Sequence, residues 1–176
     1  ESASTTRTAC PHGERRRATS PAGLSPAGLA RERLAPNLVD VSAYIPPLRD
    51  IRFVMDHVAD LPAVCATELF GHVDVDTIHE VLAEVGRFMA EVVAPTNRDG
   101  DTVGSRWEPN GPAGGRVVTP DSFGPAYRKW VESGYNAMPF DPDYGGAGFP
   151  WVSAIAVQEM LTSANMALSL CPLLTQ

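Results

Sequence analysis

The sequence has few of the residues from which metal and nucleic-acid sites are commonly built. Only three of its 176 residues are cysteines, at positions 10, 65 and 171, and their spacing fits neither a CxxC zinc pair nor a disulfide framework. There is one lysine, and the net charge is −7, whereas binding to phosphates requires a basic face. We therefore expect a protein of the reducing cytoplasm with no metal site and no nucleic-acid partner.

The motifs of cofactor binding and nucleophilic catalysis are missing too. There is no GxGxxG after a strand, no GxxxxGK[ST] and no GxSxG. The glycine-rich segment 144–148 precedes an apolar stretch, but glycine supplies the positive φ angles of a tight turn, so we interpret it as a turn and not as a phosphate cradle. Gln158, Glu159 and Asn165 interrupt that apolar stretch before it reaches the length of a membrane span.

Aromatic residues are absent before Tyr44, and this part of the sequence contains the tandem SPAGLSPAGL. Residues 1–40 carry six arginines and four acidic residues, whereas the rest of the chain carries eight basic and seventeen acidic residues. Such a segment cannot bury enough apolar surface to offset its ordering entropy, so residues 1–42 are predicted to be a disordered, low-complexity leader. A transit peptide is the alternative, although the prolines and glycines break any amphipathic helix.

From residue 43 the composition is that of a globular domain, and apolar residues recur at helical spacing. The spacing predicts a short helix over 48–58 and a stronger one over 76–93, whose opposite stripe is charged. Asp74 or Asp76 is a candidate N-cap of the second helix, Thr77 with Glu80 fits a capping box, and Arg87 is spaced to pair with Glu91. Pro95 is expected to weaken continuation of this helix.

The second half of the chain alternates loop and helix signals. Residues 97–120 are rich in Gly, Pro, Asp and Asn and predict a long loop, flanked by short extended pieces at 106–107 and 117–118. A third helix follows, with Asp121 or Ser122 as its cap and Gly134 as its stop. Its apolar face comprises Phe123, Tyr127, Trp130 and Val131. The last segment is apolar almost all round and predicts one buried helix or two consecutive ones, so the fold class is all-α.

Three groups of residues carry chemistry that could form a site. The cluster His72, Asp74, Asp76 and His79 contains ligand types, but its spacing matches no usual metal motif. Glu159 is a lone acid in an apolar helix, and if it is buried it is a candidate general base. We prefer the interpretation that it is a packing residue that forms an ion pair with an arginine. Cys65 and Cys171 lie in apolar surroundings and are interpreted as small core residues, not nucleophiles.

Three blocks of the sequence resemble consecutive blocks of one enzyme family. They are YIPPLRDIRFVMDHV, EVGRFMAEVVAPTNRDGDTVG and DPDYGGAGFPWVSAIAVQEMLTSANMALSLCPLLTQ. In this order they resemble the N-terminal helical domain of the larger bacterial acyl-CoA dehydrogenases, the 3-methylmercaptopropionyl-CoA dehydrogenase-like subgroup. The resemblance covers residues 43–176, and the sequence departs from it in the longer EPNGPAGGR loop and at Gly124-Pro125. Because the apolar pattern is still running at Gln176, we expect a truncated domain.

The resemblance implies a function that the residue pattern alone does not. Family members oxidise the α,β bond of an acyl-CoA thioester in fatty acid metabolism, with a glutamate as base and FAD as hydride acceptor, and pass electrons to an electron-transfer flavoprotein. Their base and flavin-binding segments belong to other domains, so this chain is expected to hold no catalytic and no FAD-binding residue, and Glu159 is not the base. The complete enzyme is expected to be a homo-oligomer.

What the resemblance assigns to this domain is one wall of the acyl pocket. The implied substrate-facing residues are Leu168, Cys171, Leu174 and Thr175, although ordinary packing between helices explains each of them as well. The isolated 176-residue chain is then expected to be inactive. The alternative is a non-catalytic helical module that binds acyl-CoA or another subunit.

Overall fold

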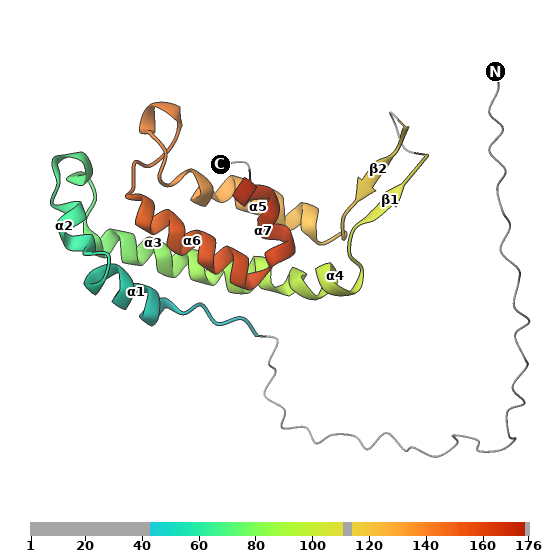
Figure 1. Ribbon diagram of the computed structural model, residues 1–176, viewed down its shortest axis with the longest axis horizontal. Coiled ribbons are helices and arrows are strands. Elements are labelled where there is room, and N and C mark those ends of the chain that lie inside the picture. The colour runs from blue at the N-terminus through green and yellow to red at the C-terminus, as the bar shows by residue number, and fades with distance from the viewer. Residues whose placement is uncertain (1–42, 111–113, 175–176) are drawn as a thin grey trace, which may run out of the picture. The chain divides into compact units, whose positions relative to one another are not determined.

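The computed structural model describes residues 43–110 and 114–174. The predicted leader, residues 1–42, therefore lies outside the described residues, as do the tip of the EPNGPAGGR loop at 111–113 and residues 175–176. The described chain is a bundle of helices with one short antiparallel hairpin (Figure 1), which confirms the all-α prediction.

The first described elements form one side of the bundle. Helix α1 (Leu48–His57) ends one residue before the predicted range of 48–58 and buries Ile51 and Met55. A short helix α2 (Leu61–Cys65) and a 3-10 turn η1 (Glu68–Phe70) follow. The side chain of Asp56 in α1 lies 2.7 Å from Nε2 of His79, which ties this side of the bundle to α3.

The central helical path is longer than the sequence predicted. Helix α3 (Val75–Phe88) continues through a π turn η2 (Met89–Val93) and a 3-10 turn η3 (Ala94–Thr96) into α4 (Asn97–Thr102), and Figure 1 shows these elements as one path. The prediction of a loop from residue 97 is therefore wrong at its start. Pro95 has no N–H to donate, and its ring crowds the carbonyl one turn back in a regular helix. The π turn before it, closed by the hydrogen bond from Ala94 N–H to Met89 O, is wider and accommodates the proline ring.

A hairpin separates α4 from α5. Strands β1 (Arg106–Glu108) and β2 (Arg116–Val118) pair antiparallel with Trp107 opposite Val117, so the two predicted extended pieces are confirmed. Helix α5 (Phe123–Ser133) follows and ends at Gly134, whose φ of 72° is the left-handed C-cap that the sequence predicted. Turns η5 (Tyr135–Ala137) and η6 (Pro142–Tyr144) lead to the last two helices.

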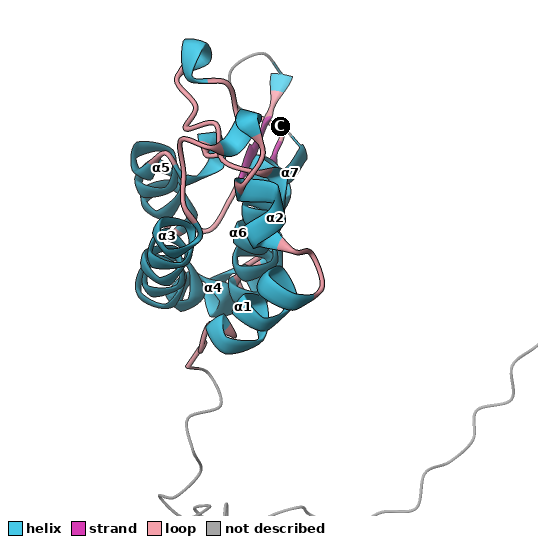
Figure 2. Cartoon of the chain, turned by 90° about the vertical axis from the view of Figure 1, so that its left-hand side faces the viewer, coloured by secondary structure: helices cyan, strands magenta, loops and turns pink. Residues whose placement is uncertain are grey.

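The apolar C-terminal segment forms two helices, α6 (Trp151–Ala164) and α7 (Met166–Leu174), which pack against each other. Helix α6 runs beside α3 (Figure 2), and these two helices enclose the centre of the core. Its fully buried members are Ile78, Leu82, Val85, Met89 and Val93 on the α3 path and Val157, Met160 and Leu161 on α6. Helix α5 adds Phe123, Ala126 and Trp130.

The structure corrects several local predictions about helix ends and charges. Asp74 caps α3 by accepting a 2.8 Å bond from Thr77 N–H, so the capping box of Thr77 and Glu80 is wrong. No side chain caps α5, and the hydroxyl of Ser122 has no partner among the described residues. Arg87 pairs with Glu84, one turn earlier in the helix, and not with Glu91.

The predicted surroundings of other residues also change. Glu159 lies on the exposed side of α6, and no Arg or Lys of the described chain forms an ion pair with it, so both interpretations that required its burial or pairing are wrong. Cys171 is exposed, so its interpretation as a core residue is wrong, whereas Cys65 is half-buried and packs against the core. Val131 is 52% exposed and does not share the buried face of α5.

Candidate functional site

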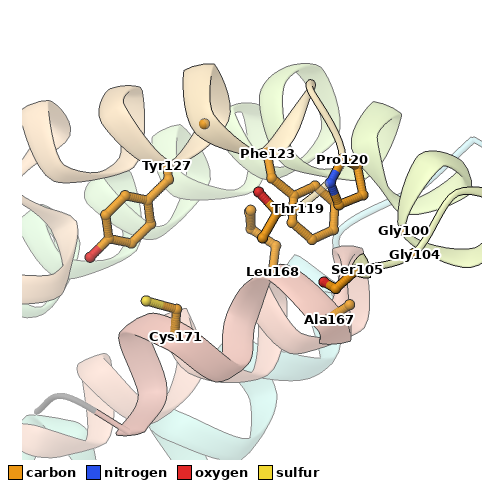
Figure 3. Close-up of a pocket in the computed structure, with 11 residues that line it drawn as sticks. Gly100, Gly104, Ser105, Thr119, Pro120, Phe123, Tyr127, Ala167, Leu168 and Cys171 are labelled. Carbon is orange, nitrogen blue, oxygen red and sulfur yellow. The ribbon is translucent and has the colours of Figure 1, made fainter. Parts of the chain in front are cut away.

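A groove of about 340 Å³ lies between α4, α5 and α7 (Figure 3). Its lining comes from three stretches that are far apart in the sequence. They are Gly100, Gly104 and Ser105 after and within α4, Thr119, Pro120, Phe123, Gly124 and Tyr127 at α5, and Ala167, Leu168 and Cys171 on α7. None of these eleven residues carries a formal charge, so the groove suits an uncharged, largely apolar ligand.

The floor of the groove depends on a glycine in α4. A Cβ on Gly100 would lie 2.9 Å from Cζ of Phe123 and 3.7 Å from Cβ of Ala167. Residues of α5 and α7 therefore both lie close to the backbone of α4 at this position. Phe123 is 9% exposed, and its ring lies at the bottom of the groove between α4 and α7.

The other end of the groove brings Tyr127 and Cys171 together. Figure 3 shows the Tyr127 side chain directed toward α7, where Cys171 projects from the helix. The hydrogen bond between the Tyr127 hydroxyl and the Cys171 side chain raises the pKa of Tyr127, because deprotonation would remove the O–H donor. These are the polar atoms at a groove end that is otherwise apolar.

Helix α7 is held in the groove wall by a buried polar residue at its start. Asn165 is 1% exposed and interrupts the helical backbone between α6 and α7 with φ −159° and ψ 99°. Its Oδ1 accepts a 3.0 Å bond from Leu168 N–H, and its Nδ2 donates to Thr96 Oγ1 at 2.9 Å. An asparagine in this place is an N-cap, because its side chain satisfies an N–H that has no partner within the helix.

The structure places the four predicted substrate-facing residues differently from one another. Leu168 is 5% exposed and lines the groove, and Cys171 lines it from an exposed position. Leu174 is 81% exposed and does not belong to the lining. Thr175 lies outside the described residues.

Sequence reasoning missed the part of the lining that comes from α4 and α5. Phe123 and Tyr127 are four residues apart and were interpreted as ordinary core residues, and Gly100 was placed in a loop. The available signal was Gly100 itself, because a glycine lets another element approach the backbone closely.

A second hollow of about 640 Å³ is larger but less suited to an apolar ligand. It lies between the chain near Tyr44, the start of α4 and the end of α6, and its rim carries the exposed side chains of Arg98 and Asp101. The Ser163 hydroxyl donates to Tyr44 Oη at 3.2 Å, and burial raises the pKa of Tyr44. Opposite charges at a solvated rim are ordinary surface chemistry, so we treat the apolar groove as the candidate site.

The remaining groups that the sequence singled out are engaged in structural contacts. Asp74 caps α3, Asp76 lies 3.7 Å from Arg52, and His79 contacts Asp56. Within residues 43–110 and 114–174, no three His, Cys, Asp or Glu side chains come together as a metal site would require. In the same part of the chain, no helix has the length and apolar character needed to cross a bilayer.

Comparison with known proteins identifies two relatives with related names. The chain is 38% identical over 132 residues to 3-methylmercaptopropionyl-CoA dehydrogenase of Ruegeria pomeroyi, an alignment that covers 75% of this chain and 22% of that protein. It is 29% identical over 127 residues to the broad-specificity linear acyl-CoA dehydrogenase FadE5 of Mycobacterium tuberculosis, covering 72% of this chain and 20% of that protein. No protein-family model matches the chain. The chain thus corresponds to about a fifth of the length of each relative.

Proposed function

Since the chain belongs to the acyl-CoA dehydrogenase family, we propose that its helical domain supplies one wall of the acyl pocket in a flavin-dependent dehydrogenase of acyl-CoA thioesters. The observation that carries this proposal is the uncharged groove between α4, α5 and α7. Two of the residues that the family resemblance implied for the acyl pocket, Leu168 and Cys171, line it.

The groove is suited to hold an alkyl chain and to keep water from it. Leu168 and Phe123 offer buried apolar surface, and each methylene removed from water contributes about 0.8 kcal/mol. We infer that the groove binds part of an acyl chain and that other parts of the enzyme bind the rest. We therefore assign to this domain binding and orientation of the acyl chain.

The lining of the groove does not fit FAD. The pyrophosphate of FAD requires cationic side chains or several convergent N–H donors, and the groove lining contains neither arginine nor lysine. We infer that flavin binding, the catalytic base and contact with an electron-transfer flavoprotein belong to other segments of the dehydrogenase. No step of the reaction is assigned to a residue of the groove.

Alkylation of Cys171 in the full 176-residue chain tests whether the groove binds an alkyl group. The rates of reaction with N-methylmaleimide and N-octylmaleimide are measured for the Cys171 peptide by mass spectrometry, in the folded chain and in urea. We expect the octyl reagent to be favoured about tenfold in the folded chain only, which corresponds to partial burial of about two methylenes. Cys65, which lies in α2 and away from the groove, is the internal control. Equal rate ratios in the folded and unfolded chain would overturn the proposal.

A second candidate function is a module that binds another subunit. Each of the last two helices leaves a row of apolar side chains exposed, Trp151 and Ile155 on α6 and Met166 and Leu170 on α7, and such rows commonly mark interfaces. Sedimentation of the chain separates the candidates. A stable dimer that hides these side chains, together with no alkyl preference at Cys171, would favour the interaction module. Tight binding of octanoyl-CoA by the chain alone would instead favour a self-contained acyl-CoA-binding module.

A further inference from the structure

Asn165 and Thr96 form a buried polar contact between two segments that are 69 residues apart in the sequence. Asn165 is 1% exposed and Thr96 is 7% exposed. The Asn165 amide donates to the Thr96 hydroxyl, and that hydroxyl donates in turn to Val93 O at 2.7 Å. The backbone of Asn165 is also bonded on both sides, from its N–H to Leu161 O and from Ser169 N–H to its own carbonyl, each at 3.0 Å. Every polar group of Asn165 thus has a partner.

The contact joins the segments that lead into two walls of the groove, α4 and α7. Thr96 is the last residue of η3, and Gly100, which forms the floor, lies four residues further along the same helical path. On the other side, Asn165 Oδ1 accepts a hydrogen bond from the N–H of Leu168, and Leu168 lines the groove. The Asn165 side chain is therefore bonded both to the segment that leads to Gly100 and to the first turn of α7, which carries Leu168.

The core alone does not fix α7 in this position. The outward side of the helix carries the exposed residues Met166, Leu170 and Leu174, so apolar packing holds it from one side only. Packing of this kind is non-directional and allows small rotations of a short helix. The hydrogen bonds of a buried amide are directional, and leaving that amide unpaired in the interior costs free energy. They therefore favour one rotation of α7 about its axis and one position of the helix relative to the core.

We propose that Asn165 and Thr96 are positioning residues that set the width of the acyl groove by fixing the start of α7 against the end of η3. This inference rests on the proposed function in that the groove is taken to hold an alkyl chain. It assigns to the pair a role beyond stability: the preference of the groove for a long alkyl group depends on their hydrogen bond.

The test compares substitutions that change the hydrogen bond but little else. Thr96→Val keeps the shape of the side chain and removes the hydroxyl, whereas Thr96→Ser keeps the hydroxyl. Ser153→Ala is the matched control, because Ser153 is fully buried, donates to Pro150 O at 2.6 Å at the opposite end of α6, and does not line the groove. Each variant is made in the full chain, and its free energy of unfolding is measured in urea. The variants are then compared at temperatures at which these free energies are equal.

Two quantities are measured in each variant. The first is the ratio of the N-octylmaleimide and N-methylmaleimide rates at Cys171, and the second is the protection of the Leu168 amide from hydrogen exchange. In Thr96→Val we expect the alkyl preference of about tenfold to fall to about twofold. We also expect the Leu168 protection to drop about tenfold, because the Asn165 side chain that accepts from the Leu168 N–H loses its own acceptor at Thr96. Thr96→Ser restores both, and Ser153→Ala leaves the alkyl preference within about twofold of the parent chain.

The outcomes separate this inference from the proposed function. An unchanged alkyl preference and unchanged Leu168 protection in Thr96→Val would overturn the positioning role, as would an equal loss of alkyl preference in Ser153→Ala. If the parent chain shows no alkyl preference, the proposed function fails, and the positioning role is then decided by the Leu168 amide and the Cys171 rate with N-methylmaleimide alone. If Thr96→Val does not fold, Thr96→Ala, which also removes the hydroxyl that accepts from the Asn165 amide, carries the same comparison.

Discussion

Gly100 and Phe123 are in contact so close that a methyl group on Gly100 would lie 2.9 Å from the end of the Phe123 ring. The two residues belong to different helices, α4 and α5, and both line the groove. The absence of a side chain at position 100 therefore sets how far the ring of Phe123 enters the groove floor.

The first prediction concerns Gly100→Ala. Alanine favours a helix by up to about 1 kcal/mol relative to glycine, but here the added methyl displaces the Phe123 ring into the groove. We expect the free energy of unfolding to change by less than about 1 kcal/mol while the alkyl preference of Cys171 falls severalfold. Gly71→Ala is the control, because Gly71 does not line the groove and the nearest atom to a Cβ there lies 3.5 Å away. An alkyl preference that survives in Gly100→Ala would contradict this account of the groove floor.

A second prediction concerns the titration of Tyr127. Hydrogen bonding with Cys171 is the main cause of its raised pKa, so Cys171→Ala should lower that pKa toward the ordinary value of about 10. The phenol then ionises at a lower pH than in the parent chain. Ring-labelled tyrosine followed by NMR resolves the four tyrosines of the sequence and measures the change. Cys65→Ala, in a helix remote from Tyr127, should leave the titration as it is, and the same shift in both variants would rule out the contact as its cause.

The N-cap of α3 predicts a dependence of stability on pH. Hydrogen bonds from Thr77 hold the pKa of Asp74 below its usual range, so the ionised form stabilises the folded state above the pKa of the unfolded chain, near 4. This contribution is lost as the pH falls through the lower pKa of the folded state. In urea unfolding at neutral pH, Asp74→Ala should therefore be less stable than the parent chain, and the difference should disappear in acid.

Asp74→Asn separates the acceptor from the charge at this cap. Asparagine still accepts the bond from Thr77 N–H but does not titrate, so this variant should retain most of the neutral-pH stability and lose the pH dependence. If it is instead as unstable at neutral pH as Asp74→Ala, the charge of Asp74 and not its hydrogen bond stabilises α3.

A fourth prediction concerns the contact between α1 and α3. Asp56 lies 2.7 Å from Nε2 of His79, and both side chains are largely buried, with 22% and 9% of their surfaces exposed. Asp56→Ala leaves the imidazole without its partner and should lower the free energy of unfolding by about 1 to 2 kcal/mol. Arg52→Ala removes a 58% exposed side chain 3.6 Å from the same carboxylate and should change it by less than about 0.5 kcal/mol. Equal effects in the two variants would show that burial does not distinguish these contacts.

Local sequence signals predicted the helices that follow from periodicity and capping. Helix α1, the start of α3 at Asp74 and the end of α5 at Gly134 follow from residues within a few positions of each other. The same signals failed at Pro95, where a proline suggested an end and the π turn before it allowed the path to continue into α4. A π turn closes from residue i to residue i+5, and neither the apolar spacing nor the proline indicated one here.

Burial was predicted less well than helix position. The apolar residues of α6 and α7 indicated helices buried on all sides, yet Trp151, Ile155 and Leu170 are more than half exposed. Apolar composition shows that a side chain favours leaving water, but it does not say which element covers it. The exposure of Cys171 and Glu159 depends in the same way on which neighbours the fold provides.

The sequence by itself determined the all-α class, most helix positions and, through three blocks of residues, membership of the acyl-CoA dehydrogenase family. Only the tertiary structure decided that Gly100, Phe123 and Cys171 line one groove, since they come from three helices that are separated along the chain. It also decided that Asn165 and Thr96 meet across 69 residues. Periodicity and capping are properties of neighbouring residues, whereas a groove and a buried hydrogen bond arise from the packing of distant segments, which no local pattern encodes.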